Sequence, residues 1–289
     1  MSKRSPTDIA ASVHQRLLNE AKKNDRPFNE LLQYYAMERF LYRLSRSPHA
    51  GRFVLKGALM FTAWKAPRSR PTMDIDLLGK LENSIETIED VFRSVCDISV
   101  EPDGLDFSAG SLESRRITED ADYEGVRVRV RGHLGNARIA VQIDIGFADV
   151  VSPKPSKVKY PTLLDMPAPE LQGYSRESAI AEKLEAMIKL GILNSRMKDF
   201  YDIWLLARQF DFEGKRLAKA IEATFAQRKT QLAKEPVAIT SVFAEDPAKQ
   251  VQWRAFVRKS RIPEAPAELP SAITVVRAFL GPVAAALVG

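Results

Sequence analysis

Two aspartates separated by a single residue are the first candidates for chemistry in this chain of 289 residues. Asp74 and Asp76 lie in the run Met73–Leu78, which reads as a β-strand. Side chains two apart on a strand point to the same face, so the two carboxylates repel each other unless a cation or proton lies between them. Hard oxygen ligands suit Mg²⁺, which commonly combines one or two carboxylates with water and substrate phosphates. The pair therefore indicates phosphoryl or nucleotidyl transfer, with two exposed aspartates on an edge strand as the alternative.

A third carboxylate, Asp144, lies in a second predicted strand, Ala137–Ile145. Alternation in this segment places apolar residues on one face and Gln142 and Asp144 on the other. If the two strands are neighbours, the three carboxylates can hold two divalent ions, which would activate an attacking hydroxyl and stabilise a leaving pyrophosphate. Sequence alone leaves the adjacency open, so the triad is a hypothesis about strand order.

Two upstream segments offer groups that could bind phosphate. Lys56-Gly57-Ala58 precedes an apolar helical run, and a glycine at the mouth of a helix lets backbone N–H groups approach a phosphate. Arg68 and Arg70, just before the aspartate pair, could hold phosphates through two hydrogen bonds each. The alternatives are a glycine required by the turn alone and an exposed basic loop.

The second half of the chain carries another set of charged candidates. Lys183 adjoins the apolar face of a predicted helix, so it could reach a cleft between the two halves. Asp199 and Asp202 are three residues apart and share a helical face, with Arg196 a turn before Asp199. The alternative is helix-start electrostatics combined with a surface ion pair between Lys198 and Asp202.

Basic residues indicate a polyanionic partner. The formal charge is +6 and the pI is near 9.3. Arg127, Arg129 and Arg131 share one face of a predicted strand, where they could bind backbone phosphates or simply form a solvated outer surface. If they lie on the same side of the sheet as Asp144, RNA binding is favoured.

The elements that must position these residues follow from periodicity. Alternating residues predict a β-hairpin with a turn within residues 132–136, and five prolines make residues 152–169 a surface connector that is neither a central strand nor a helix. The remaining predicted elements are helices within 6–47, a helix at Ile85–Val95, and helices at 176–190, 195–209, 214–234 and in the apolar tail. We expect an α/β (α+β) fold with a small mixed sheet, followed by a helical half.

Composition excludes several classes of site and places the protein among ordinary globular chains. Hydrophobic residues make up 45% and charged residues 28%, and Cys96 is the single cysteine, so an intramolecular disulfide is impossible. The N-terminus lacks the apolar core of a signal peptide. The apolar stretch Ser271–Gly289 contains Arg277 and Pro282, and we interpret it as a buried terminal helix rather than a membrane anchor. The expected location is cytoplasmic, with no membrane partner.

The order of these motifs resembles the AbiEii/AbiGii toxin family of nucleotidyltransferases. The resemblance runs from about residue 30 to residue 210 and rests on five motifs: Leu55–Gly57, Arg70–Leu77, Asp144, Ala181–Lys183 and Arg196–Asp202. It implies a polymerase-β-like nucleotidyltransferase domain, residues 1–170, joined to a helical domain, residues 171–289. It further implies that an NTP and Mg²⁺ bind in the cleft between the domains.

The resemblance also implies roles for individual residues. Asp74 and Asp76 would bind the metal with Asp144 as the third carboxylate, and Lys183 would bind the triphosphate. Asp199 and Asp202 would shape the site and act on the acceptor as a base. The nucleotide-binding set would comprise Lys56, Gly57, Ala58, Arg70, Lys183 and Arg196. This chain has Gly57-Ala58 where relatives often have Gly-Gly or Gly-Ser, so a hydroxyl that could contact a phosphate is missing.

Relatives of this kind act as the toxin of a toxin–antitoxin pair, and some add nucleotides, often pyrimidines, to the 3′ end of tRNA. We therefore expect NTP and an RNA, tRNA above all, as substrates, and an antitoxin encoded upstream as partner. The alternatives are a nucleotidyltransferase that modifies a protein, a metal-dependent phosphatase, a glycosyltransferase and a non-catalytic nucleic-acid-binding protein. The last would have no need of three carboxylates in a basic chain, because carboxylates repel phosphate unless a metal bridges them.

Overall fold

The computed structural model describes residues 6–66, 70–119, 123–233, 235–262 and 264–288. The chain forms two compact units. Unit 1 comprises Met1–Ala63, Thr72–Ala148 and Lys157–Gly173, and unit 2 comprises Trp64–Pro71, Asp149–Ser156 and Tyr174–Gly289. The predicted domain boundary between residues 170 and 171 stays a prediction, and the two short segments that join unit 2 were not foreseen.

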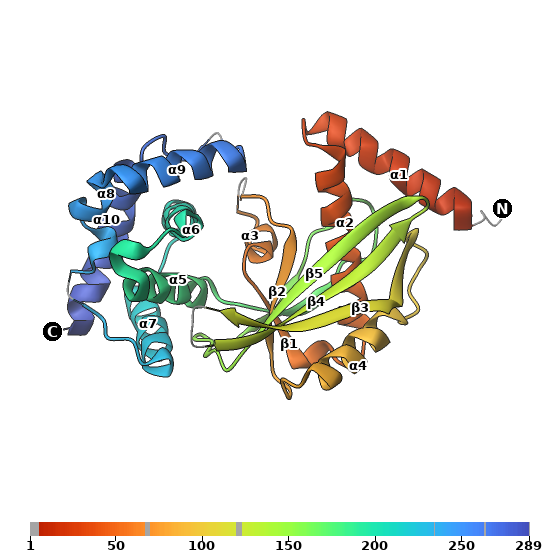
Figure 1. Ribbon diagram of the computed structural model, residues 1–289, viewed down its shortest axis with the longest axis horizontal. Coiled ribbons are helices and arrows are strands. Elements are labelled where there is room, and N and C mark those ends of the chain that lie inside the picture. Colours follow the sequence, from red (N-terminus) through yellow and green to blue (C-terminus); the bar gives the residue numbers. More distant parts are fainter. Residues whose placement is uncertain (1–5, 67–69, 120–122, 234, 263, 289) are drawn as a thin grey trace. The chain divides into compact units, whose positions relative to one another are not determined.

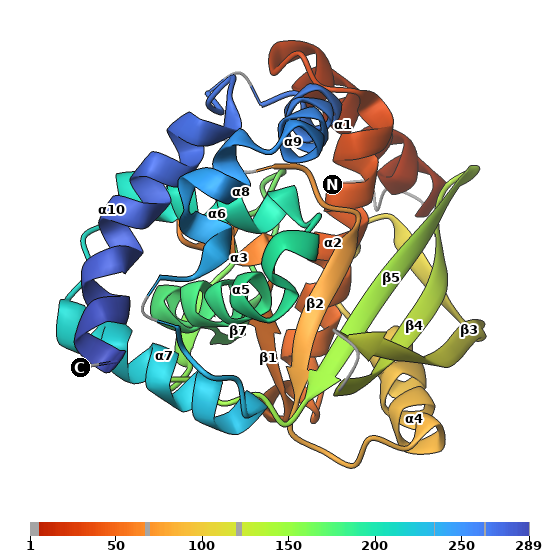
Figure 2. The same cartoon turned by 60° about the vertical axis from the view of Figure 1, so that its left-hand side comes forward.

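Unit 1 is built on a seven-stranded mixed sheet in the order β3-β4-β5-β2-β1-β7-β6 (Figures 1 and 2). Strands β3, β4 and β5 are successive antiparallel neighbours, β5 pairs in parallel with β2, and β1 is antiparallel to β2 and parallel to β7. The strands are β1 Phe53–Lys56, β2 Asp74–Gly79, β3 Leu105–Glu119, β4 Tyr123–Leu134, β5 Ala137–Phe147, β6 Ser156–Lys159 and β7 Glu170–Gly173. The mixed α/β fold expected from the sequence is therefore confirmed.

The two faces of this sheet differ in chemistry because the strands alternate. Val126, Val128 and Val130 of β4 are buried, as are the apolar residues of β5 beside them. This apolar face packs against helices, as shown by the edge-to-face contact of Phe40 with Phe107 at 5.3 Å between ring centroids. The helices of unit 1 are α1 Pro6–Lys23, α2 Phe28–Arg46, α3 Leu59–Ala63 and α4 Ile85–Cys96, with a short 3-10 helix η1 at Ala50–Arg52. The other face carries the polar residues.

The sequence predicted β2, α4 and the β4–β5 hairpin, but not β3. Alternation in β3 is interrupted by a register shift between Ser108 and Glu113, which hides the strand from a period-two pattern. The proline-rich connector contains β6, a strand of four residues at the edge of the sheet, where missing backbone donors are tolerated.

Unit 2 is helical. Its core includes Phe200 stacked on Phe243 at 5.0 Å between ring centroids and the fully buried Trp253. Its helices are α5 Arg176–Leu190, α6 Met197–Gln209, α7 Gly214–Arg228, α8 Ser241–Glu245, α9 Pro247–Ser260 and α10 Leu269–Val288, with 3-10 helices η2 Gly191–Leu193 and η3 Val237–Ile239. Two ion pairs attach the short segments to these helices: Arg70 to Asp202, and Asp149 to Arg228, each at 3.0 Å.

Helix α10 is long and apolar enough to cross a membrane, with a mean hydropathy of 1.8. This is weak evidence, because core helices of soluble proteins meet the same criterion. Four apolar residues of this helix are buried within unit 2: Ala272, Ile273, Val276 and Leu280. Only 28% of its most apolar 18-residue window is buried, however. The burial expected from the sequence thus holds for one face of the helix only.

Candidate functional site

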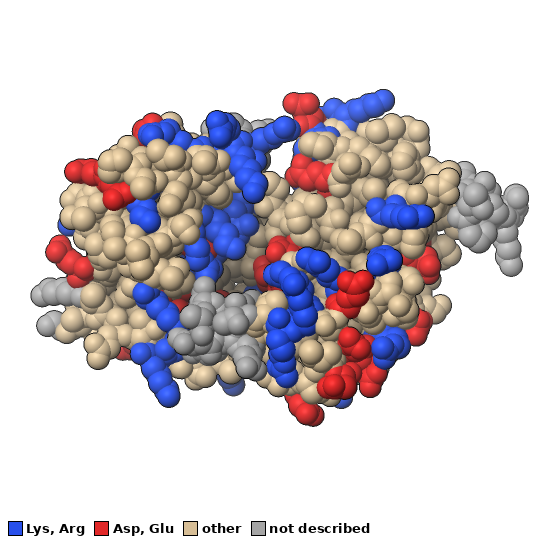
Figure 3. Space-filling view, in the orientation of Figure 1, with Lys and Arg blue, Asp and Glu red and all other residues tan. Residues whose placement is uncertain are grey.

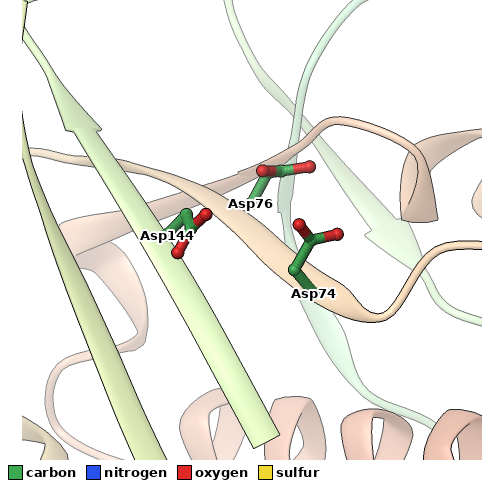
Figure 4. A group of neighbouring side chains, drawn as sticks. All are labelled: Asp74, Asp76 and Asp144. Atoms are coloured by element: carbon green, nitrogen blue, oxygen red, sulfur yellow. The ribbon is translucent and has the colours of Figure 1, made fainter. Parts of the chain in front are cut away.

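Three carboxylates from β2 and β5 meet on the polar face of the sheet in unit 1. The two strands are parallel neighbours, and their register places Asp76 directly beside Asp144 and Asp74 beside Gln142. One oxygen from each of Asp74, Asp76 and Asp144 lies within 4.8 Å of the others (Figure 4). The strand adjacency on which the predicted triad depended is therefore present.

Each carboxylate is fitted closely to its surroundings. The Thr72 hydroxyl donates to Asp74 Oδ1. Asp76 lies over Gly57, where a Cβ would overlap Asp76 Oδ2 and Cγ. Gly57 has φ of +70°, so its backbone conformation also favours glycine. The structure thus gives Gly57 a steric role beneath Asp76, between the buried neighbours Lys56 and Ala58.

Asp144 is bound by an arginine of the adjacent strand β4. Arg127 Nε donates to Asp144 Oδ1 at 2.7 Å and Arg127 Nη2 donates to Oδ2 at 2.6 Å. The two residues are direct partners in the β4–β5 register. The Asp144 side chain is 8% exposed and that of Arg127 26%, so water screens this pair only in part.

The donor set fits a hard divalent cation. Three carboxylates supply oxygen ligands within a small volume, and the missing side chain at Gly57 leaves Asp76 its place in that volume. Oxygen ligands of this kind suit Mg²⁺ or Mn²⁺ rather than the softer metals that prefer thiolates. Mutual repulsion of the carboxylates, reduced by Arg127, would be relieved by such an ion.

The arginines of β4 lie on the same side of the sheet as Asp144. Arg129 Nε and Nη2 donate to Gln142 Oε1 at 3.2 and 3.1 Å, and Arg131 Nη2 pairs with Glu113 at 3.3 Å. Arg129 and Arg131 are exposed. Figure 3 shows basic side chains gathered over the strands of unit 1, with acidic ones among them. The condition that favoured RNA binding in the sequence is thus met for this face.

A second charged cluster lies within unit 2, around two buried aspartates of α6. Lys183 Nζ, from α5, contacts Asp199 Oδ1 at 3.1 Å and Asp202 Oδ2 at 2.7 Å. Arg196 Nε donates to Asp199 Oδ2 at 2.7 Å. Arg70 donates to both oxygens of Asp202, at 3.0 and 3.1 Å. Three cations thus share two buried carboxylates.

Burial and ion pairing oppose each other in this cluster, and ion pairing dominates. Burial raises the pKa of Asp199, but Lys183 and Arg196 outweigh it, so the pKa is lowered from its ordinary value. Burial likewise lowers the pKa of Lys183, but Asp202 and Asp199 outweigh it and the pKa is raised. At neutral pH Lys183 is a cation and Asp199 an anion.

The alternative of a surface ion pair between Lys198 and Asp202 is wrong. Asp202 is 1% exposed and is paired with Lys183 and Arg70, because α6 turns this side toward α5 and the segment Trp64–Pro71. Sequence reasoning missed both Arg70 as a partner of Asp202 and Arg127 as a partner of Asp144. Arg68 lies outside the described residues. That the two clusters line one cleft stays a prediction.

Comparison with known protein families agrees with the chemistry of these residues. A family model described as nucleotidyl transferase AbiEii toxin, type IV TA system, matches residues 39–276. No curated protein matches the chain in sequence. Among solved structures, JHP933 from Helicobacter pylori is similar at 14% identity, covering 90% of this chain and 93% of its own, with a TM-score of 0.49. A second H. pylori chain, provisionally described as a nucleotidyltransferase, has 14% identity, 90% and 96% coverage, and a TM-score of 0.46.

Proposed function

Since the chain belongs to the AbiEii family of nucleotidyl transferase toxins, we propose that it transfers a nucleoside monophosphate from an NTP to the 3′ end of an RNA. It is a nucleotidyltransferase of a toxin–antitoxin system. The proposal adds Mg²⁺ as the cofactor, tRNA as the acceptor and a block of translation as the result. The observation that carries it is the group of three carboxylates on β2 and β5.

The first part of the proposal concerns the metal. Asp74, Asp76 and Asp144 would hold Mg²⁺, which when bound supplies stabilisation of phosphate charge and activation of an acceptor hydroxyl. Thr72 keeps Asp74 in its rotamer, and Gly57 leaves space for Asp76. These neighbours fix the carboxylates before any substrate binds, which is the preorganisation that a catalytic site requires.

The second part concerns the nucleotide. Lys183 is cationic and shares two aspartates with Arg196 and Arg70, and a group of three cations suits a triphosphate. Asp199 and Asp202 are already bound by Lys183, Arg196 and Arg70. A carboxylate with a lowered pKa is a weak base, so we assign Asp199 to positioning these cations rather than to proton abstraction.

The third part concerns the acceptor. Arg129 and Arg131 are exposed on the face that carries Asp144, and Arg115 lies opposite Arg127 in the β3–β4 register. Residues two apart on a strand are about 6.8 Å apart, so Arg129 and Arg131 place their guanidinium groups in a row along β4 that could contact successive phosphates of a nucleic-acid strand. An RNA 3′ end is therefore the acceptor that the surface supports best. We further propose that the protein acts in the cytoplasm and is neutralised by an antitoxin encoded upstream.

The test is transfer of labelled nucleotide. The purified chain is incubated with Mg²⁺, each α-labelled NTP in turn, and total RNA together with total protein. Label in RNA, concentrated in tRNA and reduced at least ~100-fold in Asp76→Asn, is the expected result. The control Asp106→Asn, an exposed carboxylate on β3, should retain activity.

The other outcomes separate the alternatives. Label in protein would replace the RNA acceptor with a protein acceptor. Release of phosphate without transfer of label would indicate a phosphatase. Retention of full transfer by Asp76→Asn would refute the carboxylate site.

A further inference from the structure

Both oxygens of Asp144 are bound by one guanidinium, that of Arg127. Arg127 forms two nearly parallel hydrogen bonds to it, at 2.7 and 2.6 Å. Paired hydrogen bonds of this kind between two ions are among the strongest in proteins. Asp74, by contrast, accepts from the neutral hydroxyl of Thr72.

The pairing of Arg127 with Asp144 is built into the hairpin. Gly135 has φ of +57° in the turn, and the register from Leu134 opposite Ala137 continues without interruption to Arg127 opposite Asp144. The guanidinium therefore approaches Asp144 from β4, whereas Asp76 approaches it from β2 on the other side. Any cation bound between β2 and β5 must share Asp144 with Arg127.

Charge sets the direction of the effect. The guanidinium of Arg127 offsets the charge of one of the carboxylates that would attract a divalent ion. A guanidinium fixed on Asp144 repels a dication nearby and occupies a lone pair on each carboxylate oxygen. With the Asp144 side chain only 8% exposed, solvent weakens this competition little.

We propose that Arg127 competes with divalent cations for Asp144, so that in the nucleotide-free protein Asp144 contributes less to ion binding than it would without Arg127. This inference rests on the proposed metal site. Arg127 is then a positioning residue that lowers the intrinsic affinity of the site for metal.

The adjacent arginine on the same strand supplies a matched control. Arg129 lies two residues further along β4, on the same face, and is exposed. Its guanidinium is bound by the amide oxygen of Gln142, not by a ligand carboxylate. Arg129→Gln therefore removes the same charge from the same strand and leaves Asp144 with its arginine.

The experiment measures binding of Mn²⁺ to the full chain without nucleotide, from the free-ion signal in electron paramagnetic resonance. Arg127→Gln is expected to bind Mn²⁺ at least ~10-fold more tightly than the unmodified chain, because a repelling charge is removed and Asp144 becomes free to bind. Arg129→Gln should stay within about threefold of it. Asp144→Asn should bind Mn²⁺ more weakly than the unmodified chain, because Asp144 then no longer offsets the charge of Arg127. In the double variant Arg127→Gln/Asp144→Asn, most of the gain should disappear, as expected when two mutations act through one interaction.

Unchanged or weaker binding by Arg127→Gln would overturn the proposal, as would an undiminished gain in the double variant Arg127→Gln/Asp144→Asn. If Arg127→Gln fails to fold because Asp144 is left unpaired, Arg127→Lys keeps the charge but not the double hydrogen bond. It should bind Mn²⁺ about threefold more tightly, and unchanged binding would count against competition. If the unmodified chain and Asp76→Asn bind Mn²⁺ equally well, the metal site itself is refuted. If Arg127→Gln binds Mn²⁺ and the unmodified chain does not, competition by Arg127 is supported.

Discussion

At the residue scale, close fit rather than residue type alone distinguishes the candidate site. An Asp-x-Asp run is common, and its significance here comes from what surrounds it. Asp76 occupies the space that a side chain at position 57 would fill, and Asp144 meets an arginine directly opposite. These neighbours limit the space and the hydrogen-bonding geometry open to Asp76 and Asp144.

Gly57→Ala is predicted to disable the site. An added Cβ would overlap the Asp76 carboxylate, and φ of +70° costs an alanine about 1 kcal/mol. A displacement of about 1 Å in a catalytic group lowers rates roughly 100-fold, so we expect nucleotide transfer to fall by about that factor. Gly51→Ala is the control, because a Cβ added at Gly51 would meet nothing within 4 Å. Normal transfer by Gly57→Ala would show that Asp76 can move without consequence.

At the element scale, the sequence predicted most of what holds the site. Alternation identified β4 and β5, and helical periodicity identified α5 and α6. The register of the hairpin was also within reach: once Gly135-Asn136 is taken as a two-residue turn, counting back pairs Arg127 with Asp144. With the turn placed only within residues 132–136, that pairing stayed undetermined.

Other features could not be read from local pattern. Parallel pairing of β2 with β5 joins residues about seventy positions apart, and no local signal sets the order of such strands. The burial of Asp202 likewise depends on Arg70, which reaches α6 from a segment 132 residues away in the sequence. Local helix rules correctly describe a charged first turn but cannot distinguish a surface pair from a buried one.

The stability that the Lys183 ion pairs give to the packing of α5 on α6 is predicted to depend on pH. The lowered pKa of Asp199 means that its contribution to stability is present above about pH 3.8 and is lost as the pH falls through the folded value. The raised pKa of Lys183 means that its contribution is present below about pH 10.5 and is lost as the pH rises through its folded value. Both contributions are therefore present around neutrality.

Lys183→Met removes the cation that Asp199 and Asp202 share. We expect the free energy of unfolding at pH 7 to fall by about 1.5–3 kcal/mol, the usual effect of losing hydrogen bonds to charged groups, because Arg196 and Arg70 still pair with the two aspartates. The pKa of Asp199 should rise because the charge of Lys183 no longer stabilises its anion, so acid unfolding should begin at higher pH. Thermal unfolding followed by circular dichroism between pH 4 and 9 measures both effects. Lys215→Met, an exposed position on α7, should change neither.

At the scale of the whole molecule, a formal charge of +6 attracts polyanions in general. The arginines beside the carboxylates would direct a bound polyanion to this face of the sheet. Phosphate contacts position a nucleic acid without reading its sequence. Selection of a tRNA 3′ end would then depend on geometry. The RNA would need to place its terminal hydroxyl at the carboxylates while its phosphate backbone lies along β4.

The double variant Arg129→Gln/Arg131→Gln is therefore predicted to weaken RNA binding and its dependence on salt. Each lost phosphate contact on a single strand lowers the slope of log affinity against log salt by about 0.7, so two contacts should lower it by about 1.4. Arg46→Gln/Arg93→Gln makes the same change in charge on α2 and α4, the helices that pack on the apolar face, and should leave the slope unchanged. Equal slopes in both double variants would mean that RNA responds to net charge alone and not to the arginines beside Asp144.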